Sequence, residues 1–101
     1  MTWRRVQVRT KPNANTAYEA YSDEGNAYIR TNYDDTGKRL SLSVTESDDG
    51  LVVTYTAIYR DEAAKNEMLS DSTISAESTR RNTINAANGI TNKTTVDEEF
   101  S

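Results

Sequence analysis

The sequence predicts an α+β fold in which a four-stranded antiparallel sheet carries helices on one face. Two observations lead to this prediction. Segments in which apolar and polar residues alternate, as in strands, lie near both ends and in the middle of the chain. Two stretches with helix start and stop signals separate them. The resulting order is strand, helix, strand, strand, helix, strand, and 101 residues suffice for one such domain.

The first strand is predicted over residues 3–10. Val6 and Val8 share one face of this segment, and Gln7 and Arg9 share the other. The strand is therefore expected to present an apolar face and a polar face.

The segment that follows decides the fold class. Residues 16–21 fit either a loop or a short strand. Residues 22–37 favour a helix, because Ser22 can act as N-cap and Gly37 can end the helix in the left-handed conformation. The alternation over residues 27–33 leaves a strand open at this point. The corresponding alternative fold is a five-stranded meander followed by helices.

The middle of the chain predicts a β-hairpin. Residues 39–47 and 51–60 have strand patterns and flank Asp-Asp-Gly at 48–50, a typical hairpin turn. The second of these strands carries β-branched and aromatic residues on both faces, so a central place in the sheet is expected.

The rest of the chain predicts helices and a last strand. Residues 61–89 are helical in pattern, with a break or kink over 70–72, after which Ser72 or Thr73 caps a second helix. Residues 90–100 form the last predicted strand.

Charge is distributed unevenly along the chain. Four basic residues and no acidic ones lie within the first eleven positions: Arg4, Arg5, Arg9 and Lys11. The densest acidic run is 97–99. If the last strand lies antiparallel to the first, the two runs become cross-strand partners. The basic residues are then neutralised within the chain, and nucleic-acid binding is not expected.

Several kinds of chemistry are excluded by composition. The chain has no Cys and no His, which removes disulfides, thiolate nucleophiles, the usual zinc ligands and the commonest general base. The acidic pairs at 34–35 and 48–49 lie in apparent turns before Gly, and Arg80 and Arg81 are expected on a solvated helix face. No catalytic residue, metal site or cofactor is predicted.

The chain is also expected to be cytoplasmic. No apolar run is long enough to span a membrane, and the arginines near the N-terminus are not followed by the apolar region of a signal peptide.

A thin apolar core suggests association. Leu, Ile, Val and Phe make up 16 of the 101 residues. Low content of these residues limits the area that one chain can bury, so a homodimer, or a complex with an unknown protein partner, is expected. The candidate ligand contacts are the large aromatic residues of the predicted strands and first helix: Trp3, Tyr28, Tyr33, Tyr55 and Tyr59.

The predicted element order resembles the ferredoxin-like fold and, at this length, the dimeric α+β barrel superfamily. Members of that superfamily pair their sheets face to face, and some are cofactor-independent monooxygenases or haem-degrading enzymes. The resemblance implies a homodimer. The histidine that ligates haem in the haem-degrading members has no counterpart in this chain.

Three stretches are similar to small uncharacterised proteins of marine tailed phages, of the cyanophage kind. They are residues 3–10, 47–56 and 85–89. The resemblance implies a phage-encoded protein in the cytoplasm of a host cell or in a virion, and it carries over no assigned activity.

The function expected from these observations is that of a phage-type accessory protein, a non-enzymatic homo-oligomeric interaction module. The alternative is a small-molecule binder, or a cofactor-independent enzyme of the dimeric α+β barrel type. Its pocket would lie between the sheet and the helices and would be lined by Tyr, Trp3 and Asn.

Overall fold

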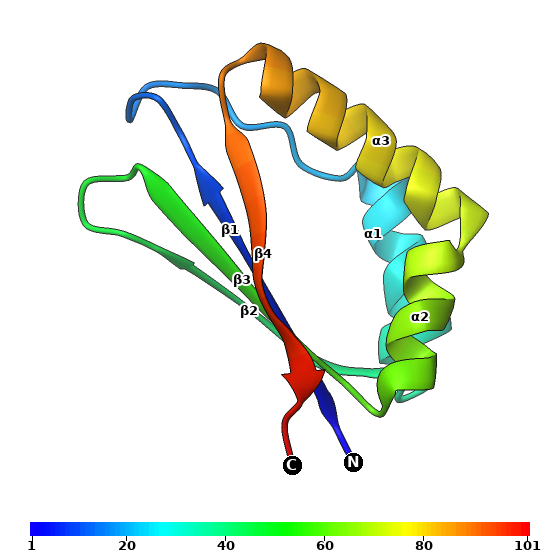
Figure 1. Ribbon diagram of the computed structural model, residues 1–101. Coiled ribbons are helices and arrows are strands. Elements are labelled where there is room, and N and C mark those ends of the chain that lie inside the picture. Colours follow the sequence, from blue (N-terminus) through cyan, green and yellow to red (C-terminus); the bar gives the residue numbers. More distant parts are fainter.

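The computed structural model describes all 101 residues and is an α+β fold. Its elements, in chain order, are β1 (Trp3–Thr10), α1 (Asp23–Ile29), the π-helical turn η1 (Arg30–Asp34), β2 (Arg39–Glu46), β3 (Val52–Tyr59), α2 (Glu62–Ser70), α3 (Ser72–Ala87) and β4 (Thr91–Glu99). The four strands form one sheet in the order β2-β3-β1-β4, and all neighbours are antiparallel. The helices lie on one face of the sheet, and the other face is bare (Figure 1).

The helical interpretation of residues 22–37 is confirmed, and the five-stranded meander is not found. The Ser22 hydroxyl accepts a hydrogen bond of 3.0 Å from the amide of Gly25, as an N-cap does. The helix then widens into η1, where the amide of Asp35 donates to the carbonyl of Arg30 at 2.8 Å. Gly37 follows with φ of 77°, a conformation that glycine adopts without strain.

The break between α2 and α3 falls at Asp71, and the predicted cap at Ser72 or Thr73 is wrong. The backbone of Asp71 is extended, which ends α2. Its Oδ1 then accepts from the amides of Thr73 at 2.9 Å and Ile74 at 3.3 Å. Asp is as good an N-cap as Ser, and its position one residue earlier lets the same residue terminate one helix and start the next.

The predicted pairing of the first and last strands is confirmed. In the β1–β4 register, Arg4 lies opposite Glu98 and Arg5 opposite Asp97. The nearest charged atoms are 3.8 Å apart in the first pair and 3.7 Å in the second. Such partly exposed pairs contribute little stability, and the backbone hydrogen bonds of the β1–β4 ladder hold the two strands side by side.

The core is small, as the composition predicts. Only 13 of the 101 residues are buried, so most side chains keep contact with solvent. The core cluster lies between β3 and the helices and consists of Ile29, Tyr33, Ala57, Tyr59, Met68 and Ile74. None of the helices has the length and hydrophobicity needed to cross a lipid bilayer.

The side of the sheet that faces away from the helices carries three valines among threonines. Val6 and Val8 of β1 pair with Thr56 and Thr54 of β3, and Val6 also pairs with Val96 of β4. These residues are half-buried although no element of the chain covers them. The valine face of β1 therefore lies on the bare side of the sheet, and the polar face of β1 lies against the helices.

Candidate anion-binding cavity

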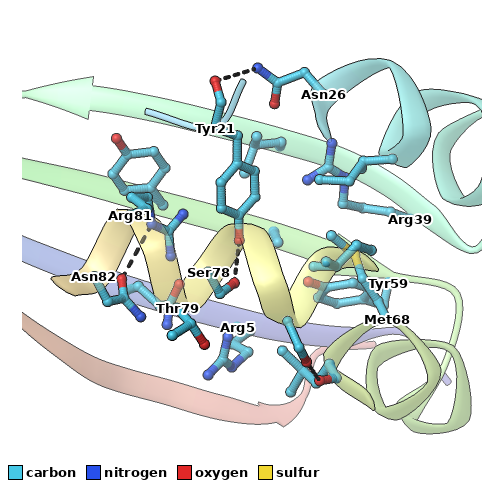
Figure 2. A pocket seen from close by; sticks show the side chains of 18 of the residues that line it. Arg5, Tyr21, Asn26, Arg39, Tyr59, Met68, Ser78, Thr79, Arg81 and Asn82 are labelled. Atoms are coloured by element: carbon cyan, nitrogen blue, oxygen red, sulfur yellow. Dashed lines mark hydrogen bonds between the residues drawn. The ribbon is translucent and has the colours of Figure 1, made fainter. Parts of the chain in front are cut away.

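A cavity of about 400 Å³ lies between the sheet and the helices (Figure 2). This volume is within the range of about 300–1,000 Å³ that is typical of small-molecule sites. Residues of β1, β2, β3 and all three helices line it, and four of them are arginines: Arg5, Arg9, Arg39 and Arg81. A cavity beside the core with four cationic side chains is unusual, because charged groups are costly to remove from water.

The alternation of β1 places the polar residues in this cavity. Arg5 pairs with Ala57, Gln7 with Tyr55 and Arg9 with Val53, and directly paired residues point to the same face of the sheet. Since Ala57 is in the core, Arg5, Gln7 and Arg9 also point towards the helices. β1 therefore places a row of polar side chains between the sheet and the helices.

Arg9 is the most deeply buried charged side chain. It is 2% exposed, and its Nε, Nη1 and Nη2 have no hydrogen-bond partner. No acidic side chain forms an ion pair with it. Buried guanidinium groups are normally satisfied on all sides, because each unpaired polar group costs about 1–3 kcal/mol and a charged one more. The N–H groups of Arg9 therefore have no hydrogen-bond acceptor within this chain.

Two tyrosine rings hold the guanidinium of Arg9 in place. Its central carbon lies 4.4 Å from the ring centroid of Tyr55 and 5.8 Å from that of Tyr18. The two rings also stack on each other, with centroids 6.4 Å apart. Cation–π contacts occupy the flat face of a guanidinium and leave its N–H groups, which lie in the plane, free to bind an anion.

Arg81 is the second cation without an acidic partner. Its guanidinium lies 4.4 Å from the ring centroid of Tyr21, and its Nε donates to Asn82 Oδ1 at 3.3 Å. Burial lowers the pKa of Arg81, and the positive charge of Arg9 acts in the same direction. Two cations without an acidic partner thus line the same cavity, and an anion between them would reduce the repulsion between their charges.

The other two arginines of the cavity have acidic neighbours. Arg39 donates to both carboxylate oxygens of Asp34, at 2.7 and 2.9 Å, whereas Nε of Arg5 lies 3.7 Å from Asp97 and has no hydrogen-bond partner. Arg9 and Arg81 are therefore the two cations of the cavity without an acidic partner.

The opposite end of the cavity is mainly apolar. Its walls are core side chains together with two half-exposed leucines: Ile29, Ala57, Tyr59, Met68, Ile74, Leu42 and Leu69. Figure 2 places Arg81 and Asn82 at one end and Tyr59 and Met68 at the other, with Ser78 and Thr79 between them. The cavity thus changes from cationic to apolar along its length.

The predicted ligand contacts fall in three places, and only two of the five residues line the cavity. Tyr55 and Tyr59 line the cavity. Trp3 packs at the edge of the core, where its Nε1 donates to Asp97 and its ring lies 5.0 Å from Lys65 Nζ.

The other two predicted residues, Tyr28 and Tyr33, lie outside the cavity. Both donate to Oδ2 of Asp71, at 2.8 and 2.7 Å. Their hydroxyl groups are thus occupied in the helix layer, where they hold the α2–α3 junction.

Arg9 and Arg81 are the residues that sequence reasoning missed. The acidic run at 97–99 was expected to neutralise the whole basic strand, but it reaches only Arg4 and Arg5, and Arg9 lies opposite Asn92. Arg81 is half-buried and is not on a solvated face. The sequence signal that could have identified Arg9 is the alternation of β1, which places Arg9 and Gln7 on the same face of the strand.

Comparison of the chain with protein-family models, with curated proteins and with solved structures finds no match. The site is therefore interpreted from its own geometry.

Proposed function

We propose that the protein binds a small anionic ligand in the cavity between its sheet and its helices. The observation that carries the proposal is Arg9, which is 98% shielded from solvent, unpaired, and held by Tyr55 with its N–H groups free. A phosphate or carboxylate group would supply the acceptors that this guanidinium lacks. Arg81 would provide a second positive charge, and Gln7 and Asn82 further polar contacts.

Binding is favoured over catalysis because the side chains in the cavity are poor general acids or bases near neutral pH. Burial raises the pKa of Tyr59 above its ordinary value, and Arg81 remains a cation although its pKa is lowered. A group that exchanges protons in a reaction works best with a pKa near the operating pH.

Titration calorimetry with inorganic phosphate tests this function. We expect saturable binding to the unmodified protein and at least tenfold weaker binding to Arg9→Met, whose side chain is unbranched, shorter and uncharged. Arg30→Met is the matched control, since Arg30 is exposed and makes no ion pair. Equal affinity of the protein and Arg9→Met, or no saturable binding to the unmodified protein, would refute the proposal.

We further propose that a second copy of the chain covers the bare face of the sheet, in the arrangement of a ferredoxin-like domain within a dimeric α+β barrel. The strand order β2-β3-β1-β4 supports this arrangement. The face carries Val6, Val8 and Val96 beside Thr54 and Thr56, and Arg4 and Glu98 lie next to them as partners of opposite charge. A face with apolar groups and charges of both signs can pair with a second copy of itself, as a two-fold interface requires.

Light scattering during size-exclusion chromatography, over a tenfold range of concentration, tests the dimer. We expect a dimer for the unmodified protein and a monomer for Thr56→Arg, because Thr56 pairs with Val6 at the centre of this face. Thr83→Arg, on the exposed side of α3, is the control and should remain dimeric. A monomeric unmodified protein at the highest concentration would refute the dimer, while leaving the anion site untouched.

A further inference from the structure

We infer that the ligand is an amphipathic anion, in which a phosphate or carboxylate head group is joined to a single short apolar chain. This inference rests on the proposed anion site and concerns the rest of the same cavity. It follows from the change in character between the two ends of the cavity and from the exposure of two leucines at the apolar end.

The cationic end fixes where the head group lies. Arg9 is near the end of β1 and pairs with Val53, whereas the core residue Ala57 pairs with Arg5, four residues away along the strand. Four residues of a strand span about 13 Å. A ligand held at Arg9 can therefore extend along β1 and β3 towards the core residues before it meets the wall at Tyr59.

The apolar end has room for a chain and lacks a strong competing charge. Arg39 and Arg5 are the cations of this part of the cavity. Asp34 holds Arg39 with two hydrogen bonds, and Asp97 lies 3.7 Å from Nε of Arg5. Leu42 and Leu69 remain 46% and 42% exposed although they line a cavity. Apolar side chains that border a cavity beside the core lose contact with water when an apolar group enters, which favours binding.

The size of the cavity limits the chain. A volume of about 400 Å³ accommodates one short chain with its head group, rather than the two long chains of a membrane lipid. The polar side chains between the ends, Ser78 and Thr79, can contact a linking ester oxygen. The size of the cavity and the placement of its polar side chains together favour a single-chain alkyl phosphate or carboxylate over an inorganic ion.

A homologous series of n-alkyl phosphates separates this inference from the anion site itself. The probes are methyl, butyl, hexyl and octyl phosphate at concentrations at which they do not aggregate, measured by calorimetry beside inorganic phosphate. We expect the dissociation constant to fall about fourfold for each added methylene, the factor that corresponds to burying one methylene group. The decrease should stop when the chain reaches the end of the cavity.

Paired leucine variants locate the chain. Leu42→Asn should raise the dissociation constant of octyl phosphate several-fold without changing that of inorganic phosphate. Leu40→Asn is the matched control, because Leu40 is also about half exposed on the same strand and does not line the cavity. It should change neither constant, and circular dichroism verifies that both variants fold.

The outcomes distinguish the two proposals. If all alkyl phosphates and inorganic phosphate bind equally, and Arg9→Met weakens them all, the anion site stands and the amphipathic ligand is wrong. Octyl phosphate that binds Arg9→Met as tightly as the unmodified protein would overturn both proposals. A methylene-dependent affinity that requires both Arg9 and Leu42 supports both.

Discussion

The guanidinium of Arg9 lies 4.4 Å from the ring centroid of Tyr55, and no acidic side chain of the chain neutralises it. The cation–π contact contributes about 0.5–2 kcal/mol, whereas burying an unpaired charge costs several kcal/mol. Because the cost of burial exceeds the gain from the cation–π contact, Arg9 destabilises the folded state, although the proposed ligand site depends on it.

Arg9→Met is therefore expected to stabilise the protein. We expect the free energy of unfolding in urea to rise by about 1–3 kcal/mol, since the variant removes an unsatisfied buried group and keeps an apolar stem beside Tyr55. Arg30→Met, at an exposed position, should change it by less than about 0.5 kcal/mol. A loss of stability in Arg9→Met would mean that the cation–π contact outweighs the burial of charge.

Asp71 joins three parts of the helix layer, and its removal should be costly. Asp71→Ala loses the cap of α3, worth about 0.5–2 kcal/mol, and leaves the Tyr28 and Tyr33 hydroxyls without their acceptor. We expect a total loss of about 2–4 kcal/mol in urea unfolding. Asp71→Ser keeps a capping oxygen and should recover part of this loss. Equal stability of Asp71→Ala and the unmodified protein would contradict the assignment.

The carboxylate of Asp71 should also make the stability of the protein decrease at acidic pH. Burial acts to raise the pKa of Asp71, but hydrogen bonds from Tyr33, Tyr28 and the α3 amides outweigh it and hold this pKa below its ordinary value. A lowered pKa in the folded state stabilises the protein above the unfolded-state pKa of about 3.9, and this contribution is lost as pH falls through the folded-state pKa.

Urea unfolding between about pH 2 and pH 6 measures this effect. Stability should decrease below about pH 4, and the decrease should be smaller in Asp71→Asn, which cannot titrate. Hydrogen bonds from Ser22 likewise lower the pKa of Glu77, so some acid dependence should persist in the variant. If the free energy of unfolding depended on pH in the same way in the unmodified protein and in Asp71→Asn, Asp71 would not contribute to this dependence.

Asn85 should hold the long connection between β1 and α1. It is buried, its Oδ1 accepts from the amide of Glu19 at 2.8 Å, and its Nδ2 donates to the carbonyl of the same residue at 3.0 Å. In Asn85→Ala, hydrogen exchange at residues 16–21 should accelerate at least tenfold, since both backbone groups lose their partner. The control Thr83→Ala, exposed on α3, should leave exchange at these residues unchanged. Unaltered exchange in Asn85→Ala would mean that other contacts suffice.

Most of the fold could be predicted from local patterns, and the site could not. Alternation, caps and the Asp-Asp-Gly turn are local signals, and they place every strand and helix. The pairing of Arg4 and Arg5 with the acidic run followed from the expected antiparallel placement of the last strand beside the first. The patterns do not say which face of β1 the helices cover, and a rule that buries valines would have chosen Val6 and Val8.

The tyrosines that contact the cations of the site could not be predicted from the sequence for a related reason. Tyr18 and Tyr21 contact Arg9 and Arg81 from a segment without regular structure, residues 16–21. Loops have no periodicity that would show which way a side chain points. Only the path of the loop across the helices brings these rings to the cations.

The position of β4 has a consequence for how the chain reaches its native state. β1 lies in the interior of the sheet, yet one of its two neighbours is the last strand, and Trp3 pairs with Glu99. Contacts so distant in sequence slow folding, because a long loop must close before they form. During synthesis, β1 and the β2–β3 hairpin would assemble first, and one edge of β1 would stay unpaired until residues 91–99 are made. A chain that lacks residues 91–99 would keep that edge open permanently and would be prone to aggregate through it.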